Sequence, residues 1–272
     1  MRRLAVIVKL GGKWRFAIAL FALQALAGQR AIAQQDGGGA LLSSAEERVA
    51  TYAAQSDCAK YEWDDRGLAP VGYIKGMALT YAKSVCEMKR GVDSAARLFA
   101  QPNEEPSYDA LAWYGENAAS SMERLRTVYA LAIGLGMRES SGNPTEGRDK
   151  TIAHPTPETA EAGLFQTSFD SFTKSGWFPS LFSAYKANPS TCRLAVFLEG
   201  VRPKHEDVLG TGAAADYQTT MKACPALAVE YAVIMLRINR AHFGPINRRK
   251  AELRRECRAM LQGIESLATC AP

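Results

Sequence analysis

Two segments with apolar residues at helical spacing constrain the fold of this chain most. One covers 120–138, where Leu125, Val128 and Ala132 fall on one helix face. The other covers 225–240, is almost wholly apolar, and begins at a proline, which suits the first turn of a helix. Strand-like alternation is rare and no internal repeat is present. The sequence therefore predicts a mainly α fold with few or no strands.

Shorter helices and two loops complete the predicted organisation. Ser43 and Ser44 precede Glu46 and Glu47 by three residues, which is typical of a capping box at a helix start. Residues 140–162 are rich in Ser, Gly, Pro and Thr, and long loops of this kind are often functional. Residues 203–214 form a second predicted loop. The other predicted helices cover 44–55, 76–89, 93–99, 108–113, 168–175, 180–186 and 248–268.

The first 33 residues have the three parts of a secretory signal peptide. Basic residues occupy 2–15, an apolar run covers 16–27, and small residues lie at Ala31 and Ala33. The apolar run is shorter than the roughly 20 residues that a spanning helix needs. We therefore expect cleavage after Ala33, a flexible linker over 34–43, and a secreted or periplasmic product without stable membrane insertion.

The net charge depends on that leader. The chain has 33 Lys and Arg against 28 Asp and Glu, a formal net charge of +5. The leader contains six of the basic residues and no acidic one, so the remainder has 27 basic and 28 acidic residues, a net charge of −1. This balance gives no reason to expect nucleic acid or an anionic membrane as a partner.

The cysteines and histidines exclude several classes of site. An even number of six cysteines after a signal peptide predicts up to three disulfides, with 15 possible pairings. No CxxC spacing supports a zinc site, and His154, His205 and His242 lie far apart. No GxSxG motif and no Gly-rich phosphate loop is present. We expect neither a metal site nor a cofactor.

Glu139 is the strongest candidate for chemistry. It ends the helix predicted over 120–138, just before Ser140-Ser141-Gly142. The negative end of a helix dipole opposes ionisation of a carboxyl, and partial burial raises its pKa further. A carboxylic acid still protonated near neutral pH is what cleavage of a glycosidic bond requires as its general acid.

Two short motifs link this residue to a known family. RESSG at 138–142 and AGLFQTS at 162–168 resemble the catalytic signature of goose-type lysozymes and soluble lytic transglycosylases, in the lysozyme-like superfamily. The resemblance covers about 120–250, with Phe165 in the usual Met place. It implies a lysozyme-like catalytic domain over 119–272, with 44–118 as an N-terminal helical segment of the same domain.

The resemblance also implies a substrate and roles for individual residues. The substrate would be peptidoglycan or a related N-acetylated glycan, cut by a monomeric enzyme at the β-1,4 bond between N-acetylmuramic acid and N-acetylglucosamine. Glu139 would be the acid. The residues implied in substrate binding are Ser140, Gly163, Leu164 and Gln166, and aromatic stacking on sugar adds Trp177.

A second carboxylate is required only for hydrolysis. Inversion needs a base that activates water, about 6.5–9.5 Å from the acid. The loop before Gly163 offers Glu146, Asp149, Glu158 and Glu161, of which Asp149 and Glu161 are best placed by spacing. A lytic transglycosylase needs no such base, because the substrate's own hydroxyl closes an anhydro ring. Chitinase-type hydrolysis and a non-catalytic glycan-binding module remain open alternatives, the latter because the family's late Tyr-Asn-Ala-Gly run is absent.

Overall fold

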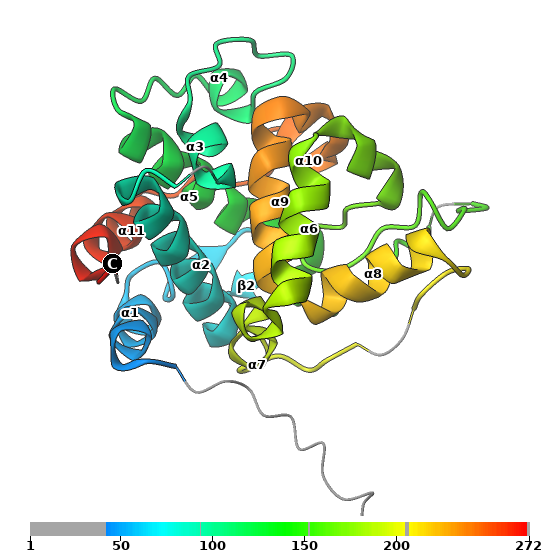
Figure 1. The fold of residues 1–272 in the computed structure, drawn as a ribbon, viewed down its shortest axis with the longest axis horizontal. Coiled ribbons are helices and arrows are strands. Elements are labelled where there is room, and N and C mark those ends of the chain that lie inside the picture. The colour runs from blue at the N-terminus through cyan, green and yellow to red at the C-terminus, as the bar shows by residue number, and fades with distance from the viewer. Residues whose placement is uncertain (1–41, 93, 152, 205–206, 271–272) are drawn as a thin grey trace, which may run out of the picture. The chain divides into compact units, whose positions relative to one another are not determined.

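The structure is mainly α, which confirms the predicted fold class. It is a computed structural model that describes residues 42–270 apart from 93, 152, 205 and 206, so the predicted signal peptide and most of the predicted linker lie outside the described residues. The long helices are α1 (Ser44–Gln55), α2 (Val71–Lys89), α5 (Ser121–Ser140), α6 (Trp177–Ala187), α8 (Ala213–Ala223), α9 (Pro225–Ile238) and α11 (Arg255–Leu267) (Figure 1).

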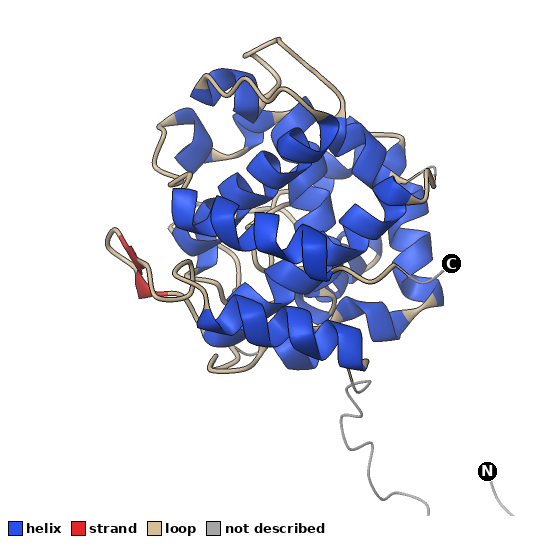
Figure 2. Cartoon of the chain, turned by 90° about the vertical axis from the view of Figure 1, so that its left-hand side faces the viewer, coloured by secondary structure: helices blue, strands red, loops and turns tan. Residues whose placement is uncertain are grey.

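Short helical turns and one hairpin connect them. The short α-helices are α3 (Ala95–Ala100), α4 (Ala110–Tyr114), α7 (Leu194–Phe197) and α10 (Gly244–Asn247), and the 3-10 turns are η1 (Phe169–Lys174), η2 (Pro189–Cys192) and η3 (Arg240–His242). Strands β1 (Glu62–Trp63) and β2 (Gly67–Leu68) pair antiparallel, with Glu62 opposite Leu68. Figure 2 shows this hairpin standing out at one edge of the helices.

Helix α9 forms the centre of the core. All its residues from Pro225 to Arg237 are buried, as expected for a helix that is apolar on every face. It packs against α2, α5 and α6, while α1 and α11 pack against each other and against α2 (Figure 1). The two apolar segments that dominate the sequence therefore lie against each other as α5 and α9.

The charged side chains of α9 are paired inside the core. Glu230 accepts hydrogen bonds from Lys83 (2.7 Å) and Tyr185 (3.0 Å). Arg237 pairs with Asp109 at 2.7 Å, and both side chains are almost fully buried. Asp109 also caps α4 by accepting from the amide of Leu111. These pairs tie residues of the 44–118 segment to the central helix.

Three disulfides select one of the 15 possible pairings. Cys58 joins Cys257 and Cys86 joins Cys270, so two bridges connect the N-terminal segment to the end of the chain. Cys192 joins Cys224 directly before α9. Bridges across such long stretches restrict the unfolded chain strongly, and they are typical of oxidising compartments.

The helix predictions hold with shifted boundaries, and besides α8 they omit the short helices α7 and α10. The capping box of Ser43 and Glu46 is present at α1. Helix α2 begins at Val71, five residues before the predicted start, directly after Pro70. The sequence analysis missed α8, because its buried face consists largely of small and polar residues such as Ala214 and Gln218. It also missed the hairpin, whose strands are only two residues long.

The predicted long loop is visible in the rest of the described chain. Residues 140–162 are free of strands and contain no helix beyond Ser140, apart from an isolated bridge between Ala162 and Thr167, and residue 152 is not described. Within the described part of the chain, none of the helices is long and apolar enough to span a membrane.

Candidate functional site

Glu139 lies in the last turn of α5, where the helix end is fixed by backbone geometry. Ser141 is in the left-handed conformation (φ 54°), and the amide of Gly142 donates to the carbonyl of Gly136. This arrangement stops the helix directly after Ser140. The carboxyl of Glu139 therefore sits at the negative end of the helix dipole, which opposes its ionisation.

Ser140 connects the end of α5 to the second motif. Its hydroxyl group lies within hydrogen-bond distance of the carbonyls of Gly136 (3.1 Å) and Leu164 (2.8 Å), and the residue is buried. The hydroxyl predicted to contact substrate is thus engaged with backbone. Ser140 holds the two motifs together, which places Glu139 beside the 163–166 turn.

The 163–166 turn is built for packing against α8. Gly163 has φ +72°, and a Cβ there would lie 3.0 Å from the carbonyl oxygen of Met221. The close approach that requires glycine is therefore to the α8 backbone, whereas the sequence analysis expected one to sugar. Leu164 is fully buried in the core, so its side chain is not available to substrate.

Gln166 is the residue of this turn that reaches the pocket. It lines the depression beside Glu139. Its side-chain Nε2 donates to the carbonyl of Gly163 at 2.9 Å, which fixes the amide while the residue itself is 8% exposed. The predicted substrate-binding position of Gln166 is thus compatible with its place in the structure.

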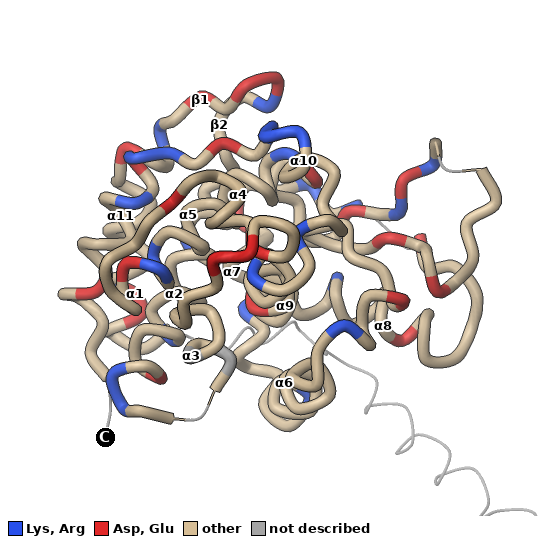
Figure 3. Tube along the Cα trace, turned by 90° about the horizontal axis from the view of Figure 1, so that it is seen from above, with Lys and Arg blue, Asp and Glu red and all other residues tan. Residues whose placement is uncertain are grey.

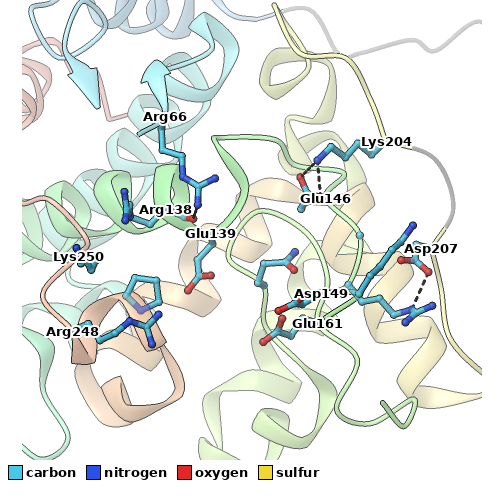
Figure 4. A pocket seen from close by; sticks show the side chains of 15 residues that line it. Arg66, Arg138, Glu139, Glu146, Asp149, Glu161, Lys204, Asp207, Arg248 and Lys250 are labelled. Atoms are coloured by element: carbon cyan, nitrogen blue, oxygen red, sulfur yellow. Dashed lines mark hydrogen bonds and ion pairs between the residues drawn. The ribbon is translucent and has the colours of Figure 1, made fainter. Parts of the chain in front are cut away.

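The depression itself is a pocket of about 720 Å³. Of the predicted polar site residues, all except Ser140 line this pocket, namely Glu139, Asp149, Glu161 and Gln166. Glu146, from the same loop, lines it too (Figure 4). Asp207 completes the acidic groups. The sequence analysis missed the basic ones, which are Arg66, Arg138, Arg148, Lys150, Lys204, Arg248 and Lys250.

Burial sets the protonation of Glu139. Desolvation of its half-buried carboxyl, with a smaller contribution from the negative charge of Glu161, raises its pKa to about 8. Arg248 and Arg66 act in the opposite direction and reduce the shift. At neutral pH the carboxyl is therefore mostly protonated and able to donate a proton.

Glu161 and Asp149 face Glu139 from the long loop, but they differ in basicity (Figure 4). Burial, followed by the charges of Asp149 and Asp170, raises the pKa of Glu161 to about 7. Asp149 is exposed, and hydrogen bonds from the amide and hydroxyl of Thr151, both 2.7 Å, lower its pKa. Glu161 is thus the stronger base of the two when ionised.

A second depression of about 390 Å³ adjoins the first. The two share Arg66, Glu139, Glu146 and Lys204 in their walls. Glu139 therefore has open space on both sides of the α5 end. A chain-like ligand that spanned both depressions would pass the carboxyl of Glu139.

Other sequence candidates lie elsewhere. Trp177 is the first residue of α6, packs partly buried against the core, and does not line either depression. Glu158 is exposed and also outside both linings. Tyr129 and Tyr231 are buried in the core, and Tyr231 stacks on Phe178.

The basic lining residues had little sequence signal. Arg66 lies in a hairpin that periodicity did not reveal, and Arg248 and Lys250 follow α10, in a segment predicted to be the start of a long helix. Only tertiary packing brings these two regions to the pocket. Among the described residues, no group of three or more His, Cys, Asp or Glu side chains is arranged to hold a metal ion.

Comparison with known proteins leaves the site to be interpreted on its own geometry. No protein-family model matches the chain, and neither a curated protein nor a solved structure does.

Proposed function

We propose that this protein is a secreted or periplasmic glycosidase that cleaves the β-1,4 bond between N-acetylmuramic acid and N-acetylglucosamine in peptidoglycan, with Glu139 as general acid. One observation supports this most directly. A half-buried carboxyl that stays protonated near neutral pH projects from a helix end into an open pocket, opposite a second carboxyl. The resemblance of the two motifs supplies the substrate, and the three disulfides support the compartment.

In the proposed hydrolysis the two carboxyls have different tasks. Glu139 donates its proton to the leaving glycosidic oxygen as the bond breaks. Glu161, when ionised, accepts a proton from a water molecule that attacks the anomeric carbon from the opposite face. A base with a pKa near the working pH suits this task, and Glu161 has such a pKa.

Lytic transglycosylase chemistry is the second candidate, and one observation favours it. Because the pKa of Glu161 is about 7, its carboxyl is not fully ionised at neutral pH and the base is not always available. A reaction in which the muramic acid hydroxyl closes a 1,6-anhydro ring does not need that base. Glu139 alone would then serve both as acid and, after giving up its proton, as base.

Mass spectrometry of the fragments released from purified peptidoglycan by residues 34–272 tests the proposal. Reducing-end muramic acid products would establish hydrolysis, and anhydro products would establish transglycosylation. Glu139→Gln is expected to lower release by roughly 10²–10⁴-fold, the usual contribution of a general acid. Glu158→Gln is the matched control, because Glu158 is an exposed glutamate of the same loop outside the pocket, and it should leave release unchanged.

Two outcomes would contradict the proposal in different ways. Full release by Glu139→Gln would remove Glu139 from the chemistry. No release by the unmodified protein, with retained binding to the cell wall, would indicate a glycan-binding module.

A further inference from the structure

The charged groups on the two sides of Glu139 differ, because one side is wholly basic and the other mixes acidic residues with Arg148, Lys150 and Lys204. Arg66, Arg138, Arg248 and Lys250 lie on one side of Glu139 and are called here the cationic wall (Figure 4). Glu146, Asp149, Glu161 and Asp207 lie on the other side (Figure 4). Figure 3 shows basic positions both beside the β1–β2 hairpin and beside α10.

The cationic wall differs from the opposite side in how its charges are balanced. On the opposite side, Lys204 pairs with Glu146 at 2.6 Å and Arg148 pairs with Asp207 at 3.1 Å. In the part of the chain that the structure describes, no side chain of the cationic wall forms an ion pair with a carboxylate. Neighbouring like charges in one pocket repel each other and attract anions.

Hydrogen bonds to backbone carbonyls hold one half of the cationic wall in place and leave its positive charges unneutralised. Arg66 donates to the carbonyl of Arg138 at 2.6 Å, and Arg138 donates to the carbonyl of Asp64 at 2.9 Å. These bonds fasten the β1–β2 hairpin to the last turn of α5. Each guanidinium has five N–H donors, so most remain for a ligand.

The other half of the wall is positioned by close packing on α5. A Cβ on Gly134 would lie 2.1 Å from the carbonyl oxygen of Glu252, so the glycine lets the segment after α10 lie directly on the helix. Tyr114 donates to the carbonyl of Ala251 at 2.9 Å and fixes the same segment. Arg248 and Lys250 are thereby held beside Glu139, with exposed side chains.

We propose that the cationic wall is a subsite for carboxylate groups carried by the glycan on one side of the bond to be cut. This inference rests on the proposed function and adds to it a requirement for an acidic substrate. Arginine binds carboxylates through paired hydrogen bonds, and lysine contributes a point charge. A neutral polymer such as chitin would leave the four charges without partners and would bind more weakly.

The test compares two preparations of one glycan. Strands of alternating N-acetylglucosamine and N-acetylmuramic acid, freed of peptides, carry one carboxylate per disaccharide. The same strands with each carboxylate converted to its methylamide are neutral and of equal length. We expect KM to be roughly tenfold lower for the acidic strands, as for loss of a charge-assisted hydrogen bond, with a smaller change in kcat.

Variants of the wall assign the preference to its residues. Lys250→Ala should raise KM for acidic strands roughly threefold, within the range of a partly exposed charge pair, and leave KM for neutral strands unchanged. Lys186→Ala is the matched control, because Lys186 is an exposed lysine in the last turn of α6 and lines neither depression. It should change neither value.

Binding to Glu139→Gln separates this inference from the proposed function. If the unmodified protein cuts both preparations with equal KM, or if Lys250→Ala lowers affinity for both equally, the subsite is refuted while the glycosidase proposal stands. If it cuts neither, the proposed function fails, and the Kd of Glu139→Gln for the two preparations still decides the subsite. In strands that keep their peptides the muramic acid carboxyl is tied up in an amide, so tighter binding of these strands would assign the carboxylates to the peptides, and weaker binding would assign them to the sugar.

Discussion

The core around α9 and the pocket around Glu139 differ in whether their buried ionisable side chains have partners. In the core, Glu230 has Lys83 and Tyr185 as partners, and Arg237 has Asp109. In the pocket, Glu139 is half-buried, and no hydrogen bond to its carboxyl is made by the described residues. The first arrangement stabilises the fold, whereas the second holds a proton that can be transferred.

The difference gives a criterion for telling structural carboxyls from candidate reactive ones in this molecule. Both Glu230 and Glu139 have a pKa raised by burial. Glu230, however, is enclosed and opposed by a lysine that favours its ionised form, whereas Glu139 opens onto solvent and faces another carboxyl. A raised pKa indicates a reactive group here only where it coincides with an open pocket.

The greatest loss of stability is expected for the buried pair of Asp109 and Arg237 in the core. Asp109→Asn leaves the buried Arg237 without a counter-charge but keeps an acceptor for the α4 cap, so the loss reflects the charge alone. We expect the free energy of unfolding to fall by about 3–5 kcal/mol. Urea denaturation with intact disulfides measures the change.

A matched surface pair provides the control for that experiment. Asp57→Asn removes an ion pair to Lys60 in which both side chains are largely exposed, and it should cost less than about 1 kcal/mol. Equal losses in the two variants would show that the buried pair contributes no more than a surface pair.

The next effect concerns the carboxyl that opposes Glu139. Glu161→Gln should lower hydrolysis roughly 10²-fold, because the base is lost. The unmodified protein should show a bell-shaped dependence of kcat/KM on pH, with Glu161 losing its charge below about 7 and Glu139 losing its proton above about 8. The variant should lose the acid limb, and its alkaline limb should move to lower pH because Glu161 no longer raises the pKa of Glu139. An unchanged profile would exclude Glu161 as the base.

The pH dependence of the free energy of unfolding tests the burial of Glu139 in the pocket. The pKa of Glu139 is about 8 in the folded protein against an ordinary value of 4.5. Between these values the unfolded chain is ionised and the folded one is not, so this group destabilises the fold increasingly as pH rises and no further above pH 8. Glu139→Gln should therefore be more stable than the unmodified protein by ~2 kcal/mol at pH 9, where the value includes a reduction for the partial exposure of the carboxyl. At pH 4 the two proteins should be nearly equal in stability. Glu158→Gln should show no such pH-dependent gain, and a gain of equal size at both pH values would refute the shift.

The sequence was sufficient for features that depend on local pattern. Helical spacing located α5 and α9, and the RESSG motif placed Glu139 at a helix end, because both are properties of contiguous residues. The cationic wall was not predictable in this way. Arg66, Arg138 and Lys250 meet only because a two-residue hairpin and a segment after α10 pack on the end of α5. The disulfide pairing likewise depended on tertiary structure, since spacing alone leaves 15 possibilities.

The roles of Gly163 and Ser140 illustrate the same limit. A motif identifies which residues recur together but does not say what they touch. In the structure Gly163 lies against the backbone of α8 and Ser140 bonds to backbone carbonyls, so both act on Glu139 through the fold. The two motifs thus border the pocket in the structure, although for Gly163 the expected contact was with sugar.

Replacing Asp149 should have the least effect of these changes. Spacing in the sequence did not distinguish it from Glu161 as the candidate base. Asp149 lies at the same pocket but is exposed, and the two hydrogen bonds from Thr151 lower its pKa, which makes it a weak base. Asp149→Asn should therefore change hydrolysis no more than roughly threefold, and loss of its charge should lower the pKa of Glu161 and shift the acid limb to lower pH. The pH dependence of kcat/KM, measured beside Glu161→Gln, checks both statements. A loss as large as that of Glu161→Gln would reverse the assignment and make the exposed carboxylate the base.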